Sequence, residues 1–199
     1  MGFNLRDTRF MSPDLEARRY PIGPVQDLPG RDRATLEAVA ARMEAAGRAW
    51  REALTGRDEA ELGRTYRPGA WTVRQLAHHA ADAHVHGLNR LRYSLTAEEY
   101  VIQPFDQQGW LMLPDAALPV EAALALMDAV NVRWGALLRG LDPALFARRV
   151  LHPQEGEQDL WRLLAKHDWH LRHHLAQVRL ALGQAGEGKE AVTPPPPQH

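Results

Sequence analysis

The chain of 199 residues has a formal net charge of −1 and contains no cysteine. A charge this close to zero argues against a general nucleic-acid-binding protein and gives no polybasic signal for a membrane surface. The lack of cysteine excludes disulfides, thiolate metal sites and a cysteine nucleophile. No apolar run is long enough for a transmembrane helix, and the N-terminus lacks the apolar core of a secretory signal. We therefore expect one globular cytoplasmic domain.

Four long segments with apolar stripes are predicted to be helices. These segments are residues 31–54, 72–95, 119–140 and 159–182. The second segment begins with a capping box, in which Thr72 is the N-cap and Gln75 follows three residues later. The third begins at Pro119, a favourable residue for the first turn of a helix. Helices of this length joined by long connections predict an all-α fold, a four-helix bundle with long crossover loops.

The connections at 56–70 and 96–118 are candidates for the wall of a binding site, because long ordered loops often line such sites. Four of their side chains are candidates for contacting a substrate, each with a structural role as the alternative: Tyr66, Arg67, Asp106 and Trp110.

A small β-hairpin is predicted around Gly156, between the third and fourth helices. The ends of the chain differ from the middle in composition. Residues 1–18 form an N-terminal extension, within which Met11 is an alternative start. Residues 184–199 form a Pro-rich tail of low complexity that we expect to be disordered. The folded domain is expected at 19–183.

Eight of the ten histidines lie in two short windows of the second and fourth helices. On the fourth helix, His170 and His174 are four residues apart, so their imidazoles lie one turn apart and are able to bind one metal ion. His167 lies on the same inward face one turn earlier. His173 is predicted to point towards the polar side of the helix.

On the second helix, the apolar periodicity places His84 within the inward face and His79 and His86 along one edge. The pattern does not choose among these three, and it disfavours only His78, which lies on the far side. A single histidine near an apolar face is more often a hydrogen-bonded core residue than a ligand. Two clusters on separate helices favour a metal site, because a metal ion needs three or four ligands.

Other polar residues on these helices have weaker assignments. Asp82 and Asp168 are candidates to orient a ligand imidazole, although carboxylates at a protein surface are commoner. The catalytic group is unknown, and Asp82 and His167 are the weak candidates for a general base. Four tryptophans are expected to be packing residues: Trp50, Trp134, Trp161 and Trp169.

Four motifs carry a resemblance to a known family: RYPIGP at 19–24, TYRPGAWTVRQLAHHAADAH at 65–84, QPFDQQGW at 103–110 and WHLRHHLAQV at 169–178. They look like those of the YfiT-like metal-dependent hydrolases in the DinB-like superfamily, which includes the bacillithiol S-transferases. The motifs follow the family's order from about residue 19 to residue 182. The resemblance therefore covers most of the chain.

The resemblance implies a four-helix bundle that binds one divalent metal ion, zinc or nickel, through three histidines. The family's first ligand is the second histidine of the HH pair, here His79. The other two are the histidine after tryptophan on the last helix and the one four residues later, here His170 and His174. The chain departs from the family at Gln177, where many members have a further histidine, so no role of that histidine is carried over. Many family members are homodimers, which is the expectation for this chain.

Three imidazole ligands leave a coordination position open, which is typical of a catalytic site. A metal-bound water would attack an ester or amide in a hydrolase. Alternatively, the metal would hold a small bacillithiol-type thiol cosubstrate as its thiolate and direct it onto an electrophile. The missing cysteine fits thiol transfer, towards which we lean slightly, and the substrate is a small molecule in both schemes. The non-enzymatic alternative is a metal-stabilised stress-response or interaction module, whose site would be closed by four protein ligands.

Overall fold

The computed structural model describes residues 13–184. The predicted N-terminal extension up to residue 12, including Met11, lies outside the described residues, as does the predicted Pro-rich tail from residue 185 onwards. None of the helices within residues 13–184 is both long enough and apolar enough to cross a membrane.

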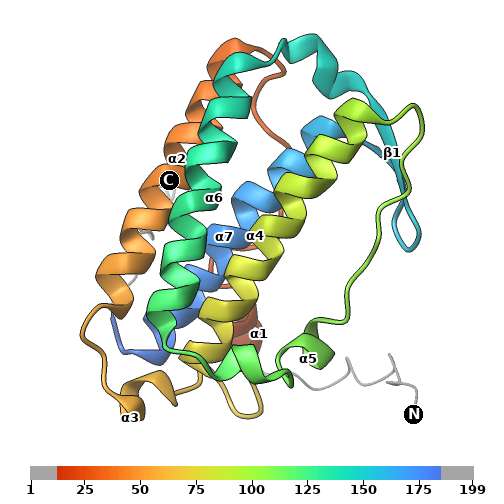
Figure 1. The fold of residues 1–199 in the computed structure, drawn as a ribbon. Helices are drawn as coiled ribbons and strands as arrows, with labels where there is room; N and C mark the ends of the chain where they lie inside the picture. Colours follow the sequence, from red (N-terminus) through yellow and green to blue (C-terminus); the bar gives the residue numbers. More distant parts are fainter. Residues whose placement is uncertain (1–12, 185–199) are drawn as a thin grey trace, which may run out of the picture.

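Four long helices pack side by side as a bundle (Figure 1). They are α2 (Arg33–Leu54), α4 (Val73–Thr96), α6 (Val120–Gly140) and α7 (Leu160–Ala181). Helices α4 and α6 run in one direction, and α2 and α7 run in the other, so the long connection from α4 to α6 is a crossover between parallel helices. The predicted four-helix bundle is confirmed.

Three of the four long helices, α2, α4 and α7, begin at side-chain caps. Thr72 and Gln75 form the predicted capping box of α4, with the Gln75 backbone N–H donating to the Thr72 hydroxyl. Asp159 caps α7 by accepting from the Arg162 N–H at 2.9 Å. Helix α6 begins one residue later than predicted, because Pro119 is its N-cap rather than part of its first turn. Side-chain acceptors at these ends satisfy backbone donors that have no partner within the helix.

Short elements occupy the connections between the long helices. They are α1 (Pro13–Arg19), α3 (Glu59–Leu62), α5 (Gln107–Trp110), η1 (Pro114–Ala117), η2 (Pro143–Ala147), β1 (Arg149–His152) and β2 (Gly156–Asp159). The antiparallel hairpin of β1 and β2 is confirmed where it was predicted, and Gly156 takes a positive φ of 81° at its turn. Helix α1 was not predicted, because its seven residues are too few for an apolar periodicity to appear.

Buried apolar side chains form two clusters that follow each other along the bundle axis. One gathers around Trp50 and the other around Trp134, both fully buried. Trp161 belongs to the second cluster. The Trp169 ring is only partly buried, and its Nε1–H donates to the Gly23 carbonyl at 3.0 Å. Each long helix contributes one end to each cluster, so the burial of apolar surface holds all four helices together.

Polar side chains lie at the level between the two clusters. The His84 Nε2–H donates to Asn131 Oδ1 at 2.8 Å, and both residues are buried. Two glycines make room for polar groups at this level. A Cβ at Gly47 would overlap the Asn131 amide, and a Cβ at Gly87 would overlap the His167 imidazole. The interior of the bundle therefore carries nitrogen and oxygen groups between the two apolar clusters.

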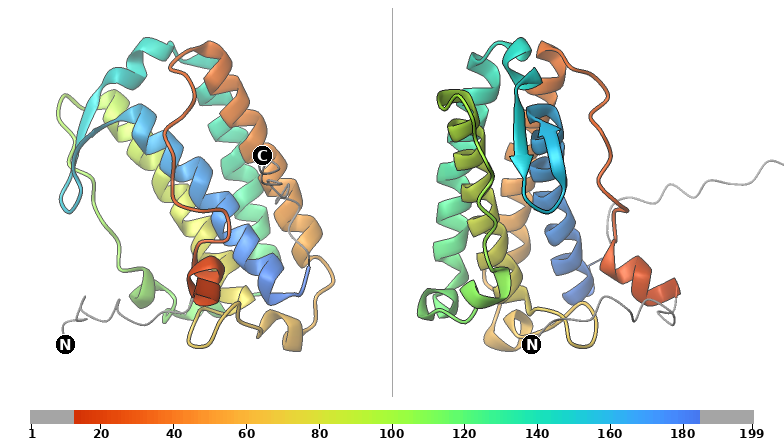
Figure 2. Two further views of the ribbon diagram at one scale, coloured as in Figure 1. Left: turned by 180° about the vertical axis from the view of Figure 1, so that it is seen from behind. Right: turned by 90° about the vertical axis from the view of Figure 1, so that its right-hand side faces the viewer.

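Two connecting segments run outside the bundle (Figure 2). Residues 20–32 pass along α7, and the Gln177 amide of that helix donates to the Arg19 carbonyl at 2.9 Å just before this segment. Residues 97–119 lead from the end of α4 back to the start of α6. Each segment covers a helix face that would otherwise be open to solvent.

Candidate metal centre

Three histidines from two helices bring one ring nitrogen each to a common point. His79 comes from α4, and His170 and His174 come from successive turns of α7. The Nε2 atom of His170 lies 3.2 Å from His79 Nε2 and 3.1 Å from His174 Nε2. Within residues 13–184, this is the group of histidine and carboxylate side chains whose ligand atoms converge closely enough to hold a metal ion.

The nitrogen separations fit neighbouring positions on one metal ion. Zinc–nitrogen bonds of about 2.0–2.1 Å at tetrahedral angles place two ligand nitrogens about 3.3 Å apart. The two separations around His170, 3.2 and 3.1 Å, are close to that value. Imidazole is a ligand that zinc, nickel and related divalent ions accept readily. The donor set therefore fits a single divalent cation.

Hydrogen bonding determines which nitrogen of His174 carries the proton. The Arg19 carbonyl only accepts, so the Gln177 Nε2 group that lies 2.9 Å from it must donate. The Gln177 Oε1 atom therefore faces His174 Nδ1 at 2.7 Å and accepts its proton. A neutral imidazole protonated at Nδ1 has its lone pair at Nε2, which is the nitrogen that points into the cluster.

Burial keeps the three imidazoles neutral. It lowers the pKa of His79 to about 3, with the nearby His174 as a second cause. It also lowers the pKa of His174 to about 4, against the effect of the hydrogen bond that His174 donates to Gln177, which raises the pKa. The pKa of His170 lies well below its ordinary value because of burial and the two neighbouring imidazoles. Neutral imidazole is the form that binds a metal ion, so no proton has to leave these nitrogens near pH 7.

Aromatic rings pack against the His79 side of the cluster. The Trp71 ring centroid lies 4.6 Å from that of His79, and the Phe105 centroid lies 6.2 Å from it. Phe105 also stacks on His86 with the ring centroids 4.4 Å apart. Such a wall excludes water and lowers the local dielectric constant, which strengthens electrostatic interactions within the site.

A cavity of about 430 Å³ adjoins the cluster at His170. His167 and Ala83 also line it, together with residues of the 102–107 segment and of the hairpin. This volume is within the range of small-molecule sites. A larger hollow of about 640 Å³ lies between α1, α2 and α7, and none of the three histidines lines it.

The structure separates the histidines among which periodicity had not chosen. His84 is a core residue that bonds to Asn131, and burial lowers its pKa to about 4. His86 stacks on Phe105 and lies outside the three-histidine cluster. His79 is the one that faces α7. The structure thus brings together the three histidines that the resemblance implied.

Two histidines that periodicity places away from the inward helix faces are nevertheless buried. His78 was placed on the far side of α4, but it is 9% exposed and its Nε2–H donates to the Leu118 carbonyl at 3.0 Å. His173 was placed on the polar side of α7, but it is 5% exposed and stacks on Trp169 with the ring centroids 4.2 Å apart. The reason is the same in both cases: a connecting segment covers a helix face that periodicity alone leaves open to solvent.

The two carboxylates that were candidates to orient a ligand imidazole, Asp82 and Asp168, have other neighbours. Asp82 is half-buried, and burial together with the nearby Asp115 raises its pKa, while His78 lowers it. Asp168 is buried and forms ion pairs with Arg42 at 3.1 Å and with Arg172 at 2.9 Å. Neither carboxylate has a hydrogen bond to an imidazole among the described residues, so the expectation that they orient one is wrong.

His167, the other weak candidate for a general base, lines the cavity beside His170. Its imidazole is 7% exposed and makes no hydrogen bond to another described residue. Burial and the nearby Arg90 lower its pKa well below the ordinary value. A neutral imidazole in this position is able to accept a hydrogen bond from a molecule in the cavity, but the lowered pKa makes it a weak general base.

The four loop side chains expected to contact a substrate do not line this cavity. Tyr66 is buried in the first apolar cluster, with the Arg67 guanidinium 5.4 Å from its ring centroid. Asp106 caps α5 by accepting from the Gly109 N–H at 3.0 Å. The Trp110 ring lies 4.9 Å from His86 and takes part in the aromatic wall. Structural roles, the stated alternatives, account for these contacts.

Several residues of the site were missed from the sequence. Trp71 and Phe105 form the aromatic wall, and Arg90, Gln158 and Lys166 line the cavity. Trp71 and Phe105 lie inside the quoted motifs, so a signal was present for these two. The other three stand among ordinary charged and polar positions and carry no pattern of their own.

The fold and the site together place the chain in the class of four-helix bundles that carry three converging histidines between two antiparallel helices. The family model described as the DinB superfamily matches residues 23–178. The chain belongs to the DinB superfamily, as its motifs indicated.

Two bacterial relatives are similar over nearly their whole lengths. A protein of Geobacillus thermodenitrificans is 38% identical over 169 residues, which cover 82% of this chain and 93% of the relative. A protein of Bacillus licheniformis is 36% identical over 167 residues, which cover 83% and 95%. Both carry the name "Putative metal-dependent hydrolase".

Two solved structures share the fold. YfiT from Bacillus subtilis, described as "a probable metal-dependent hydrolase with an unusual four-helix bundle topology", superposes with a TM-score of 0.78 at 30% identity. That match covers 85% of this chain and 99% of YfiT. A mycothiol-dependent maleylpyruvate isomerase matches with a TM-score of 0.58 at 20% identity, over 72% of this chain and 60% of its own. The second likeness concerns the fold alone.

Proposed function

We propose that the protein is a divalent-metal-dependent enzyme, a hydrolase of small molecules. In this proposal His79, His170 and His174 hold one zinc or nickel ion, and the cavity beside His170 receives the substrate. The convergence of three imidazole Nε2 atoms, with His170 Nε2 at 3.2 and 3.1 Å from the other two, carries the proposal. The names of the bacterial relatives support the same class.

A divalent cation held in this way supplies Lewis acidity and a coordination position that no protein side chain fills. The chain's own residues do the rest. Gln177 holds His174 in the tautomer whose Nε2 is free to coordinate. Trp71 and Phe105 keep water away from His79. His167 is within the cavity wall, where its neutral ring is able to accept a hydrogen bond from the substrate.

Metal content tests the ligand assignment. Purified protein is expected to contain about one zinc or nickel ion per chain by elemental analysis. Separate His79→Ala, His170→Ala and His174→Ala variants are expected to lose it. His86→Ala is the matched control, because His86 lies on α4 near Phe105 but outside the cluster. A wild-type protein with no bound metal after growth and dialysis in the presence of zinc would refute the proposal.

Thiol transfer is the second candidate reaction. The chain contains no cysteine, so a thiol nucleophile would have to come from a cosubstrate. The two reactions differ in whether they require an added thiol. Hydrolysis of an ester panel proceeds without added thiol, whereas consumption of 1-chloro-2,4-dinitrobenzene requires a small thiol such as bacillithiol. Both activities are expected to disappear with a chelator and to return with the metal.

A non-catalytic metal-stabilised module remains the alternative from another class. A structural zinc site is usually closed by four protein ligands, whereas three histidines converge here within residues 13–184. A chelator that lowered the melting temperature while no substrate in either panel was turned over would favour that alternative.

A further inference from the structure

Cationic side chains outnumber carboxylates on the wall of the cavity beside His170. Arg90, Arg162 and Lys166 line it, against one carboxylate, that of Glu155, among its lining residues. An excess of positive charge in a partly closed space attracts anions, because the surrounding protein screens the field less than water does.

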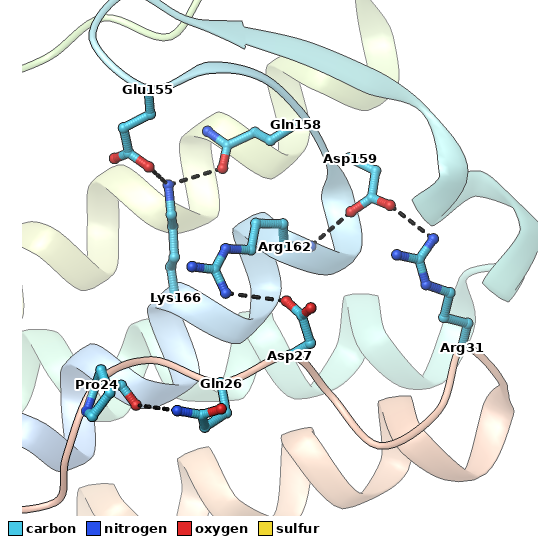
Figure 3. A network of polar contacts seen from close by, with 9 residues as sticks. All are labelled: Pro24, Gln26, Asp27, Arg31, Glu155, Gln158, Asp159, Arg162 and Lys166. Atoms are coloured by element: carbon cyan, nitrogen blue, oxygen red, sulfur yellow. Dashed lines mark hydrogen bonds and ion pairs between the residues drawn. The ribbon is translucent and has the colours of Figure 1, made fainter.

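Two of the three cations already have carboxylate partners (Figure 3). Lys166 forms an ion pair with Glu155, and its Nζ also donates to Gln158 Oε1 at 2.9 Å. Arg162 forms an ion pair with Asp27 at 3.1 Å. These pairs belong to the network that joins α7 to the hairpin and to the 20–32 segment.

Arg90 is the third cation on the cavity wall. No carboxylate lies within ion-pair distance of it among residues 13–184, although Glu155 is near enough to act on it electrostatically. Within the described residues its side chain makes one hydrogen bond, from a terminal nitrogen to the Gln103 carbonyl at 3.2 Å. Its Nε is buried and has no partner there. Burial lowers the pKa of Arg90 below its ordinary value.

A guanidinium group has five N–H donors, and one neutral carbonyl satisfies a single one of them. Arg90 is partly buried, and the partial loss of water around such a charge costs free energy that an anion bound beside it offsets. Holding the Gln103 backbone would account for one hydrogen bond, but it does not require a charge. A bidentate carboxylate or similar anion uses both the charge and the fork of donors.

The cavity extends along α4 from the level of His170 towards Arg90. Ala83 and Arg90 both line it, and they are seven positions apart on the helix, about 10 Å along the axis. The wall also includes apolar side chains, among them Ile102, Phe105 and Leu163. A ligand that fills this space has an apolar body with its two ends in different chemical surroundings.

We propose that the cavity binds a small molecule with an apolar body and a carboxylate or similar anionic group, with the anionic end at Arg90 and the other end at His170. The part of this inference that concerns His170 as the reacting end rests on the proposed function. The anion site at Arg90 does not depend on a bound metal.

The test uses the full chain, stripped of metal, with two probes of nearly equal shape: 3-phenylpropionate and its neutral analogue 3-phenylpropionamide. Dissociation constants come from calorimetric or NMR titrations at constant ionic strength. Wild type is expected to bind the carboxylate about tenfold or more tightly than the amide, as a charge-assisted hydrogen-bonded pair predicts. Arg90→Met is expected to lose this preference, and Arg90→Lys to restore part of it. Arg92→Met is the matched control, because Arg92 lies on the same helix and does not line the cavity.

Three results would overturn the inference: no binding of either probe to wild type, equal binding of both probes, or an unchanged preference in Arg90→Met. Circular dichroism and the melting temperature verify that each variant is folded, and Arg90→Lys provides the comparison if Arg90→Met is not. Metal content is measured separately on untreated protein. If wild type prefers the carboxylate probe but the untreated protein contains no metal, the Arg90 anion site is supported and the proposed enzymatic function fails. If the untreated protein contains metal but shows no preference for the carboxylate, the anion site fails and the proposed function is unaffected.

Discussion

His174 and Gln177 are joined by a hydrogen bond of 2.7 Å from the imidazole Nδ1–H to the amide Oε1. The same amide donates to the Arg19 carbonyl at 2.9 Å and to His173 Nε2 at 3.0 Å. Gln177 is buried, and each of these contacts agrees with one orientation of its amide. The orientation of a single side chain therefore links the segment before α2 to the tautomer of His174 at the candidate metal centre.

Gln177→Leu is expected to weaken metal binding about 10- to 100-fold, because a residue that orients a metal ligand usually contributes that much. Competition with a chelator of known affinity measures the effect. Gln177→Glu keeps an acceptor for His174 Nδ1 and is expected to retain most of the affinity, although it loses the donor to Arg19. Equal affinity of Gln177→Leu and wild type would show that the hydrogen bond does not hold the ligand.

Gly87→Ala is expected to destabilise the fold by about 1–3 kcal/mol, because the added Cβ would overlap the buried His167 ring. Chemical denaturation measures the change in the free energy of unfolding. Gly140→Ala is the control, since a Cβ there meets no other atom within 4 Å. Adding His167→Ala to Gly87→Ala is expected to remove the clash, so the two changes should be non-additive. Strict additivity would contradict the contact.

The metal-free protein is expected to lose stability in mild acid, partly through His84. Burial lowers the pKa of His84 from 6.5 to about 4, so the folded state binds fewer protons than the unfolded state between these values. Its contribution is therefore fully present above about pH 6.5 and is lost as the pH falls towards 4, by at most about 1.4 kcal/mol per pH unit. Urea denaturation between pH 7 and pH 5 measures how the free energy of unfolding changes with pH. This change should be smaller in His84→Gln than in wild type, and an equal change would show that His84 does not contribute to the acid sensitivity.

Asp168→Ala is expected to destabilise the fold by about 1–3 kcal/mol, because it removes the carboxylate that pairs with Arg42 and Arg172. Both arginines are partly exposed, so water compensates part of the loss. Metal content should stay unchanged, since Asp168 has no contact with the candidate ligands among the described residues. If a folded Asp168→Ala protein lost its metal, this would indicate that Asp168 does help to orient a ligand imidazole.

Local signals in the chain predicted much of the fold. The capping box of Thr72 and Gln75, the apolar stripes of the four long helices and the turn at Gly156 all appear where they were expected. These features depend on residues close together in sequence, so helix and turn geometry determines them. The pairing of His170 and His174 belongs to the same category, because one turn of helix separates them.

Residues distant in the chain decided what periodicity left open. His79, His84 and His86 all lie towards the interior or its edge, and only the packing of α4 against α7 selects His79. The burial of His78 and His173 follows from the connecting segments that cover them. Arg90 acquires its significance in the same way: its sequence neighbours do not reveal that Lys166 and Arg162 have carboxylate partners while Arg90 has no ion-pair partner within residues 13–184.

The sequence by itself determined the helices, their caps and the two histidine-rich windows, because these follow from interactions within a few residues. The family resemblance implied which three histidines converge, although periodicity did not. Tertiary structure alone decided that Gln177 orients His174 and that Arg90 lines the cavity with no ion-pair partner among residues 13–184. These relationships depend on how one helix is rotated against another and on what the loops cover, and no periodicity within a single segment encodes that rotation.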